Sequence, residues 1–302
     1  PMYAKLYGAT LHGIDGCIIT VEVDISQGLP VFDIVGLPNQ SVKEARERVR
    51  AAIKNSGYDF PMRRIVVNLA PATIRKSSAG LDLAIALGVL IASGQIKGRK
   101  ANISALLNRC LFMGELALDG SLLPTFGTLA MSLAGLEANY STIYTSVENG
   151  NNLKAIPNLS IYGESSLQNI ITVLENQVKS KSISTFKKVK IGKNQDEILT
   201  DTMDNKNHNT TYDVDFGDVQ GQELGKRAML ISAAGHHHCI MIGPPGGGKT
   251  MMAERLPTIL PPMTWNEMVE VSRIQDVIGL LGDKGLVKTR PFRHPHHTAT
   301  LA

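Results

Sequence analysis

The chain has 302 residues, 43% of them hydrophobic, and a formal net charge of +4, which indicates a globular protein of about two domains. Its three cysteines, Cys17, Cys110 and Cys239, lie far apart without C-x-x-C spacing, which argues against a disulfide framework or a zinc ribbon. The start has no secretory-signal pattern, and the longest apolar stretch, residues 81–93, is too short to span a bilayer. We therefore expect a cytoplasmic protein with no membrane segment.

The first elements of the chain are predicted to be two strands and an amphipathic helix. Residues 17–25 alternate apolar and polar side chains, which is typical of a half-buried strand, and a second apolar run follows at 31–37. Ser41 and Glu44 have the spacing of a capping box, so we expect a helix that begins there and stops at 55–57. Its outer side carries lysines and arginines among two glutamates. We interpret this side as a solvated face rather than a nucleic-acid contact.

Strands and helices then alternate up to about residue 176. Residues 81–93 are expected to form a helix that is apolar on nearly every side, so it should be buried at the domain centre. The last helix, at 165–177, can be capped by Ser165 and Gln168. The other expected elements are strands at 64–70, 110–118 and 143–145 and a helix at 129–138. This alternation predicts an α/β or α+β domain over residues 1–176.

The composition changes after this domain. Residues 179–193 contain six lysines and no acid, and the following stretch turns acidic and then polar, so the segment has little to bury. We predict a mobile linker over residues 177–211. Its lysines could contact nucleic-acid phosphates, although solubilising a linker is the commoner use of such composition.

The strongest motif lies at residues 243–250, Gly-Pro-Pro-Gly-Gly-Gly-Lys-Thr, which match G-x-x-x-x-G-K-[ST] completely. The apolar run at 239–242 precedes it and a helix should follow, which is the strand, loop and helix order of a phosphate cradle. Lys249 is placed to reach the β- and γ-phosphates, and the Thr250 hydroxyl to bind Mg²⁺. The predicted ATP-binding residues are Gly243, Pro244, Pro245, Gly246, Gly247, Gly248, Lys249 and Thr250.

Two histidine-rich stretches flank this motif. Residues 236–238 are three histidines on an expected strand, where neighbours point to opposite faces and cannot converge on one metal ion. Residues 290–297 combine arginines and histidines that could meet phosphates or could form a turn packed within the same module. A second capping box, Thr264 with Glu267, predicts a helix between these stretches.

Many ordered stretches of the chain resemble the YifB/ComM family of bacterial Mg-chelatase-like AAA+ ATPases. They are residues 28–30 (Gly-Leu-Pro), 34–38 (Ile-Val-Gly-Leu-Pro), 43–50, 54–57, 67–72, 218–222, 243–250, 256–262 and 290–297. The resemblance implies a Lon-protease/ribosomal-S5-like α/β domain over 1–176 and an incomplete P-loop AAA+ (Mg-chelatase-like) α/β domain over 212–302. It further implies ring hexamers and, for ComM proteins, an ATP-driven DNA helicase that promotes branch migration in natural transformation.

The resemblance also assigns roles to residues before the first AAA+ helix. This segment usually packs on the adenine ring, and Val219, Gly221 and Gln222 match its position. The chain departs from the family pattern after Thr250, because no Walker B Asp-Glu, sensor or arginine finger follows. We therefore expect a fragment that binds ATP with Mg²⁺ and hydrolyses it poorly.

Two rival functions come from the same resemblance. Residues 77–87 resemble the Lon segment that holds the nucleophilic serine, with Ser78 at its position, which would make the protein an ATP-dependent protease. The lysine base of Lon would fall near Met131, but residues 127–138 contain no lysine, so we interpret the domain as a retained scaffold and Ser78 as a helix cap. A magnesium-chelatase subunit is the other alternative, although such subunits lack an N-terminal domain of this kind.

Overall fold

The computed structural model describes residues 2–37, 39–74, 79–98, 100–179, 212–282 and 285–295. Packing divides the chain into two compact units. The first comprises Pro1–Ile198 with Ser272–Leu286, and the second comprises Leu199–Val271 with Val287–Ala302. The predicted linker lies outside the described residues from position 180 onward. None of the helices in the described ranges has the length and apolar character required to cross a bilayer.

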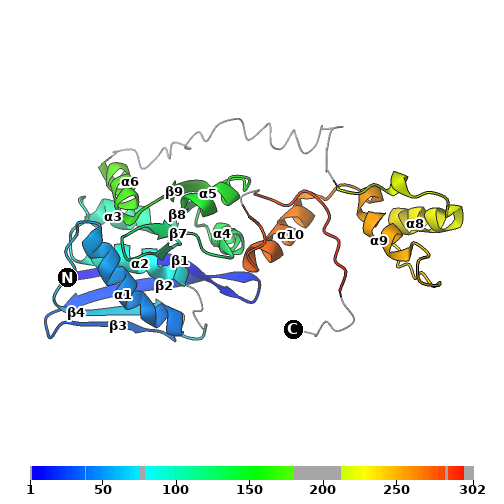
Figure 1. The fold of residues 1–302 in the computed structure, drawn as a ribbon. Coiled ribbons are helices and arrows are strands. Elements are labelled where there is room, and N and C mark those ends of the chain that lie inside the picture. The colour runs from blue at the N-terminus through cyan, green and yellow to red at the C-terminus, as the bar shows by residue number, and fades with distance from the viewer. Residues whose placement is uncertain are drawn as a thin grey trace. The chain divides into compact units, whose positions relative to one another are not determined.

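The first unit is built on a four-stranded sheet in the order β1-β2-β4-β3 (Figure 1). Ile19, Val21 and Val23 are fully buried on one face of β2, while Thr20 and Glu22 between them are partly exposed, which confirms the predicted half-buried strand. β3 and β4 are parallel neighbours joined through α1. The bounds are Met2–His12 for β1, Asp15–Ser26 for β2, Val31–Val35 for β3, Gln40–Asn55 for α1 and Arg64–Ala70 for β4.

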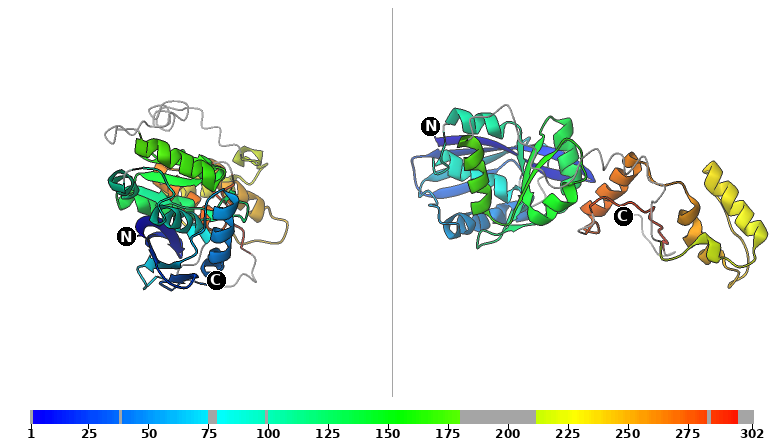
Figure 2. Two further views of the ribbon diagram at one scale, coloured as in Figure 1. Left: turned by 90° about the vertical axis from the view of Figure 1, so that its left-hand side faces the viewer. Right: turned by 90° about the horizontal axis from the view of Figure 1, so that it is seen from above.

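Helix α2, Asp82–Ala92, lies at the centre of this unit, as its sequence predicted. Ten of its eleven residues are buried, and it packs against β1, β2 and α1 (Figure 2). Gly88 allows a close approach, because a Cβ atom there would lie 2.5 Å from a methyl of Val23 on the sheet. A short 3-10 turn, Ala79–Leu81, precedes the helix. The helix therefore forms the central layer of the hydrophobic core.

A second, parallel sheet with the order β5-β8-β9 completes the first unit. The rings of Phe112, Tyr144 and Tyr162 stack from strand to strand, each pair with centroids 4.9 Å apart. The buried Tyr144 hydroxyl donates a 2.6 Å hydrogen bond to Gln177. The remaining elements are α3 (Lys100–Leu107), β5 (Cys110–Phe112), β6 (Glu115–Leu116), β7 (Leu122–Leu123), α4 (Thr128–Glu137), β8 (Thr142–Ser146), α5 (Val147–Leu153), β9 (Ser160–Glu164) and α6 (Leu167–Lys179).

Some predicted boundaries in this unit are wrong. The first-turn amide of α1 is capped by Asn39 rather than Ser41, and that of α6 by Ser166 rather than Ser165, because these side chains precede the helices that actually form. The single strand expected at 110–118 is broken into β5 and β6. Gly114 lies between them, where its backbone pairs with Gly80 and Leu83 at the start of α2 instead of with a strand.

The second unit contains helices but no strand among its described residues. The strand predicted at 239–242 is not formed, and the side chains of Ile240 and Ile242 are 84% and 89% exposed. A strand's backbone groups are satisfied only by a neighbouring strand, and the described part of this unit offers none. The small core consists of Phe216, Val219, Met229 and Met252. The helices are η2 (Phe216–Asp218), α8 (Glu223–Gly235), α9 (Lys249–Arg255), η3 (Leu256–Ile259) and α10 (Trp265–Val277), whose last six residues belong to the first unit.

Candidate nucleotide-binding site

The glycine-rich loop at 243–248 leads directly into α9, as the motif predicted. Gly246 and Gly248 have φ angles of 79° and 77°, a backbone conformation that residues with a Cβ adopt only with strain. Gly248 is the N-cap of α9. A Cβ at Gly243 or Gly246 would meet no atom within 4 Å, so nothing crowds the exposed backbone of the loop at these residues. The loop therefore has the backbone and the room that an approaching phosphate chain requires.

Lys249, the first residue of α9, reaches back across this loop. Its Nζ atom donates hydrogen bonds of 2.9 Å to the carbonyl oxygen of Gly243 and 2.7 Å to that of Pro244. An ammonium group has three N–H donors. Two of them hold the lysine over the loop, and the third can donate to an anionic oxygen placed there. The side chain is thus fixed where it can bind a phosphate without first losing rotational freedom.

The residues of the motif include one side chain, that of Thr250, which could bind the Mg²⁺ ion of a nucleotide. Thr250 is exposed in the first turn of α9, next to Lys249, so its hydroxyl can provide one oxygen ligand. Mg²⁺ prefers oxygen ligands in an octahedral arrangement and is usually bound by one or two protein groups plus phosphate oxygens and water. Thr250 would therefore hold the ion only together with bound phosphates.

The three residues expected to contact adenine differ in their exposure to solvent. Val219 is 3% exposed and packs in the small core with Phe216 and Met252. Gly221 and Gln222 are exposed and have φ angles of 65° and 56°, and Gln222 is the N-cap residue of α8. The structure thus brings Gly221 and Gln222 to the surface and keeps Val219 inside. The adenine-packing role of the three stays a prediction.

The segment that carries these residues is fastened to the end of α9 by contacts that the sequence did not single out. The Phe216 amide donates a 3.1 Å hydrogen bond to the Thr258 hydroxyl, which itself donates to the Arg255 carbonyl at 2.8 Å. The Arg255 guanidinium lies 3.7 Å from the carboxylate of Asp218. The spacing of Asp215 and Asp218 forms a capping box in η2, the one sequence signal that could have located this turn.

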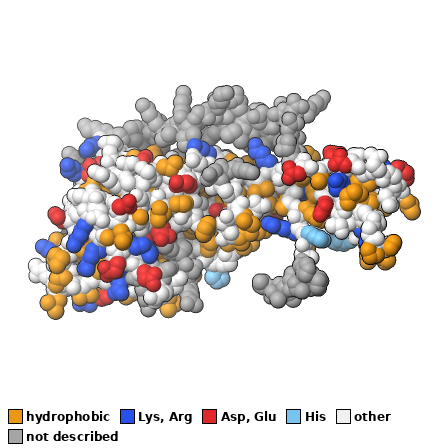
Figure 3. Space-filling view, viewed as in Figure 1, with side chains coloured by type: hydrophobic (Ala, Val, Ile, Leu, Met, Phe, Trp, Pro, Cys, Tyr) orange, Lys and Arg blue, Asp and Glu red, His pale blue; other side chains and the backbone are white. Residues whose placement is uncertain are grey.

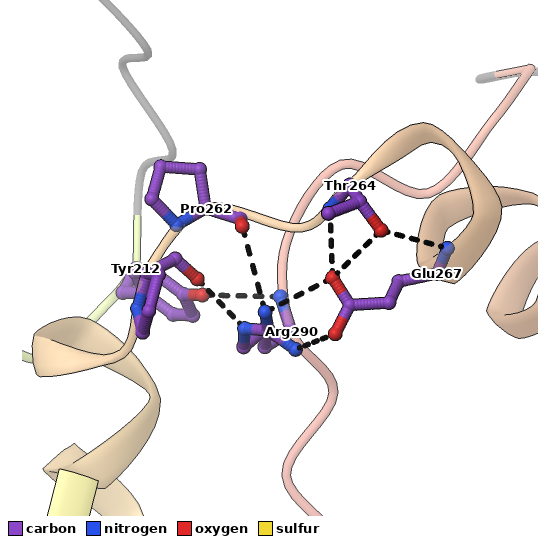
Figure 4. Close-up of polar contacts among 6 residues, drawn as sticks. Tyr212, Pro262, Thr264, Glu267 and Arg290 are labelled. Atoms are coloured by element: carbon purple, nitrogen blue, oxygen red, sulfur yellow. Dashed lines mark hydrogen bonds and ion pairs between the residues drawn. The ribbon is translucent and has the colours of Figure 1, made fainter. Parts of the chain in front are cut away.

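Arg290 is fully engaged in a structural contact (Figure 4). Its guanidinium forms two hydrogen bonds with the Glu267 carboxylate, of 2.9 and 3.2 Å, and others with the carbonyls of Pro261 and Pro262. The Arg290 side-chain hydrogen bond is the main reason that the pKa of Glu267 falls to about 2. Residues 290–297 were expected either to contact phosphates or to form a turn packed within the module. Arg290 has the second role.

Glu267 also belongs to the second predicted capping box, which is confirmed. The amide of Thr264 donates to the Glu267 carboxylate at 2.7 Å, and the amide of Glu267 donates to the Thr264 hydroxyl at 3.3 Å. The Glu267 carboxylate therefore both caps α10 and binds Arg290. Arg293 and His294 are exposed, and His296 and His297 lie outside the described residues.

The basic side of α1 is partly exposed to solvent and partly packed against the rest of the unit. Arg48 makes a 2.7 Å ion pair with the buried Asp82, and Arg50 lies over the Phe60 ring at 5.0 Å from its centroid. Figure 3 shows Lys and Arg side chains interspersed with Asp and Glu over the visible face of the N-terminal domain. Mixed signs of charge do not favour a polyanion. The interpretation of a solvated face therefore fits only part of this side, because Arg48 and Arg50 are packed against Asp82 and Phe60.

The histidines at 236–238 are not on a strand, contrary to expectation. His236 ends α8 with a φ angle of 53°, and the chain continues without regular structure. All three side chains are exposed. In the described ranges, no group of three or more His, Cys, Asp or Glu side chains is arranged to hold a metal ion.

The peptidase alternative gains nothing from the structure. Ser78 lies outside the described residues. Met131, where the base of a Lon-like site was expected, is fully buried on α4. A buried thioether cannot accept a proton from a serine hydroxyl. The helix that would have to supply a base presents none at that position.

Comparison with known families matches both parts of the chain. Residues 21–149 match the model of subunit ChlI of Mg-chelatase, and residues 215–302 match the model of magnesium chelatase, subunit ChlI. The Lon protease of Mycolicibacterium smegmatis is 26% identical over 158 residues, 50% of this chain and 19% of that protein. This more distant likeness agrees with an α/β domain of the Lon type.

Relatives match the chain over nearly its whole length. Competence protein ComM of Haemophilus influenzae is 35% identical over 99% of the chain, and the uncharacterized protein YifB of Salmonella typhimurium is 38% identical over 96%. These alignments cover 54% and 52% of the two relatives, so the chain spans about half the length of the curated proteins it matches. The chain belongs to the YifB/ComM family of Mg-chelatase-like AAA+ ATPases.

Proposed function

We propose that residues 243–250 bind the triphosphate of ATP together with Mg²⁺. The observation that carries this proposal is the position of Lys249, whose Nζ atom is held by two loop carbonyls with one N–H left to donate. The left-handed glycines and the open space around the loop support it. Thr250 would complete the coordination of the metal ion when the phosphates are present.

Titration of the chain with a fluorescent ATP analogue tests this proposal. A hydrogen bond to a charged group is worth about 1.5–3 kcal/mol, so Lys249→Ala should weaken binding about 10- to 100-fold. Lys288→Ala removes an exposed lysine of the same unit and should leave the affinity unchanged. If Lys249→Ala binds as tightly as the original chain, the nucleotide site lies elsewhere.

We further propose that the complete protein uses ATP to move DNA strands, as a hexameric helicase that promotes branch migration. Support comes from the resemblance of the chain to ComM proteins and from the lack of a lysine near Met131, which weakens the protease alternative. Of the lysines of 179–193, Lys179 ends α6 and pairs with Glu175, and the others lie outside the described residues, so the cluster offers no further support. Arg290 is committed to Glu267, so phosphate contacts are expected from other side chains.

Stimulation of ATP hydrolysis by candidate ligands separates the alternatives. Forked DNA, duplex DNA, an unfolded casein-like protein and a porphyrin would each be added to the full-length protein. Forked DNA should stimulate hydrolysis, and binding should weaken steeply with salt because phosphate contacts release counterions. Stimulation by unfolded protein, with cleavage lost in Ser78→Ala, would favour the protease, and a response to porphyrin alone would favour a chelatase.

A further inference from the structure

Residues Ser272–Leu286 follow the glycine-rich loop in the chain, yet they belong to the compact unit of the N-terminal domain. They comprise the C-terminal half of α10 and the turn after it. In the front view and in the view from above, the end of α10 lies beside α4 (Figures 1 and 2). Ser272, Leu281 and Leu286 are at most 7% exposed. This segment is therefore packed on a domain that folds from a distant part of the sequence.

Asp276 makes the most specific contact of this segment. Its side chain is 5% exposed, and its Oδ2 atom accepts a 2.7 Å hydrogen bond from the amide of Leu129 in the first turn of α4. The Gly127 amide also donates to it. The first amides of a helix have no partner inside the helix, and Gly127, the N-cap residue of α4, has no side chain to cap them. Asp276 supplies the missing cap from elsewhere in the chain.

Two other contacts lie on either side of Asp276. Arg273 makes an ion pair with Asp15, the first residue of β2, and also donates at 3.4 Å to the carbonyl of Ile14 in the turn between β1 and β2. Gly279, with a φ angle of 73°, lies against the ring of Phe126, where a Cβ atom would be 2.8 Å from the nearest ring carbon. The segment thus meets the N-terminal domain through an ion pair, a helix cap and a close backbone contact, all within seven residues of sequence.

The helix that receives Asp276 is the one on which a Lon-like base would have been expected. It has no lysine, and Met131 points into the core. Its first turn is nevertheless used, because the buried carboxylate of Asp276 binds there. Burial of a carboxylate is costly unless hydrogen bonds satisfy it, so this contact is selective for one register of the segment.

We propose that the start of α4, the β1–β2 turn and the first residue of β2 form a docking surface for residues 272–282 of the same chain, with Asp276 fixing the register. In this arrangement the N-terminal domain anchors residues 272–282, a segment that follows the glycine-rich loop in the sequence. The role is independent of peptidase chemistry and of nucleotide binding.

Amide hydrogen exchange on the full chain tests the proposal through the exposed ion pair. The side chains of Asp15 and Arg273 are 71% and 28% exposed, and neither belongs to the hydrophobic core, so Asp15→Arg and Arg273→Glu should leave the core in place. Each single variant should exchange faster in the first turn of α4 and in residues 272–282, by up to about fivefold. The double variant restores opposite charges and should return both regions to the original rates, with strand β4 as the internal reference.

Asp276→Ala tests the cap itself. Loss of a helix cap typically corresponds to about fivefold faster exchange, and Asp276→Asn should lose less because its amide oxygen can still accept. Glu270→Gln changes an exposed carboxylate on the same helix and should have no effect. Unchanged exchange at the start of α4 in Asp276→Ala would overturn the proposal. The proposal would also be overturned if the Asp15→Arg/Arg273→Glu double variant exchanged its amides as fast as the single variants. This second result can be obtained even if Asp276→Ala fails to fold.

Discussion

The two units of the chain differ in whether a predicted strand is formed. Residues 17–25 alternate apolar and polar side chains and residues 239–242 are a continuous apolar run; both patterns predict a strand, but only residues 17–25 become one. In β2, Val21 and Val23 are fully buried between neighbouring strands and α2. In the second unit, Ile240 and Ile242 face solvent. An apolar run therefore predicts burial only where the rest of the unit provides strands to pair with.

The hydrophobic cores of the two units also differ, in size and in composition. The core of the first unit joins two sheets and several helices through residues with almost no exposed surface. The core of the second unit has four buried residues, two of them methionines, between short helices. Flexible methionines fill irregular gaps and specify a packing arrangement less strictly than branched side chains. We therefore expect the stability of the chain to reside mainly in the first unit.

The largest expected effect is that of Leu87→Ala, which truncates a fully buried side chain of α2. A cavity of this kind costs about 3 kcal/mol of unfolding free energy. Urea unfolding followed by far-ultraviolet circular dichroism should show this loss in the main transition. Met252→Ala in the second unit should leave that transition in place, because Met252 packs in a separate, smaller core. Equal losses in both variants would contradict the difference between the cores.

A smaller effect concerns the pH dependence of the first unit. Burial raises the pKa of Asp82 from 3.8 to about 6, although hydrogen bonds from Arg48 and the Leu116 amide oppose the rise. The carboxyl thus binds a proton more tightly in the folded state than in the unfolded chain. Its contribution to stability is complete below the unfolded pKa and is lost as the pH rises through about 6.

Asp82→Asn checks this sign. Between pH 3.8, the pKa of Asp82 in the unfolded chain, and about pH 6, the original chain should lose stability relative to the variant as the pH rises. Urea midpoints measured across this range by circular dichroism give the comparison. Parallel profiles for the two chains would show that the proton on Asp82 is not linked to folding.

The sequence predicted features whose cause is local. The alternation in β2, the all-round apolar character of α2 and the capping box of Thr264 and Glu267 each depend on neighbours within a few residues, and all are confirmed. The cap of α1 was misplaced because Asn39 and Ser41 are both good N-caps, and only the helix start decides between them. Gly114 breaks a predicted strand through a partner about 30 residues away.

In the candidate site, too, the sequence predicted local features but not contacts between distant segments. The reach of Lys249 across its loop follows from the local motif. The fastening of Phe216 to Thr258 and the cap that Asp276 places on α4 join segments 42 and 147 residues apart. No periodicity or spacing in the sequence contains such a pair. Tertiary contacts of this kind are visible only once the fold has brought them together.

The smallest expected effect sharpens the comparison between the two predicted strands, residues 17–25 and 239–242. Ile242→Thr replaces an exposed side chain with no strand neighbour, so the free energy of unfolding should change by less than about 0.5 kcal/mol. Val23→Thr makes a similar exchange in β2, where the side chain is fully buried, and should cost about 1–3 kcal/mol because the new hydroxyl lacks a partner. Urea unfolding by circular dichroism measures both. If Ile242→Thr proved as costly as Val23→Thr, residues 239–242 would have to be buried in solution, for example by pairing with another chain. Unfolding midpoints that rise with protein concentration in the original chain, but not in Ile242→Thr, would identify that pairing.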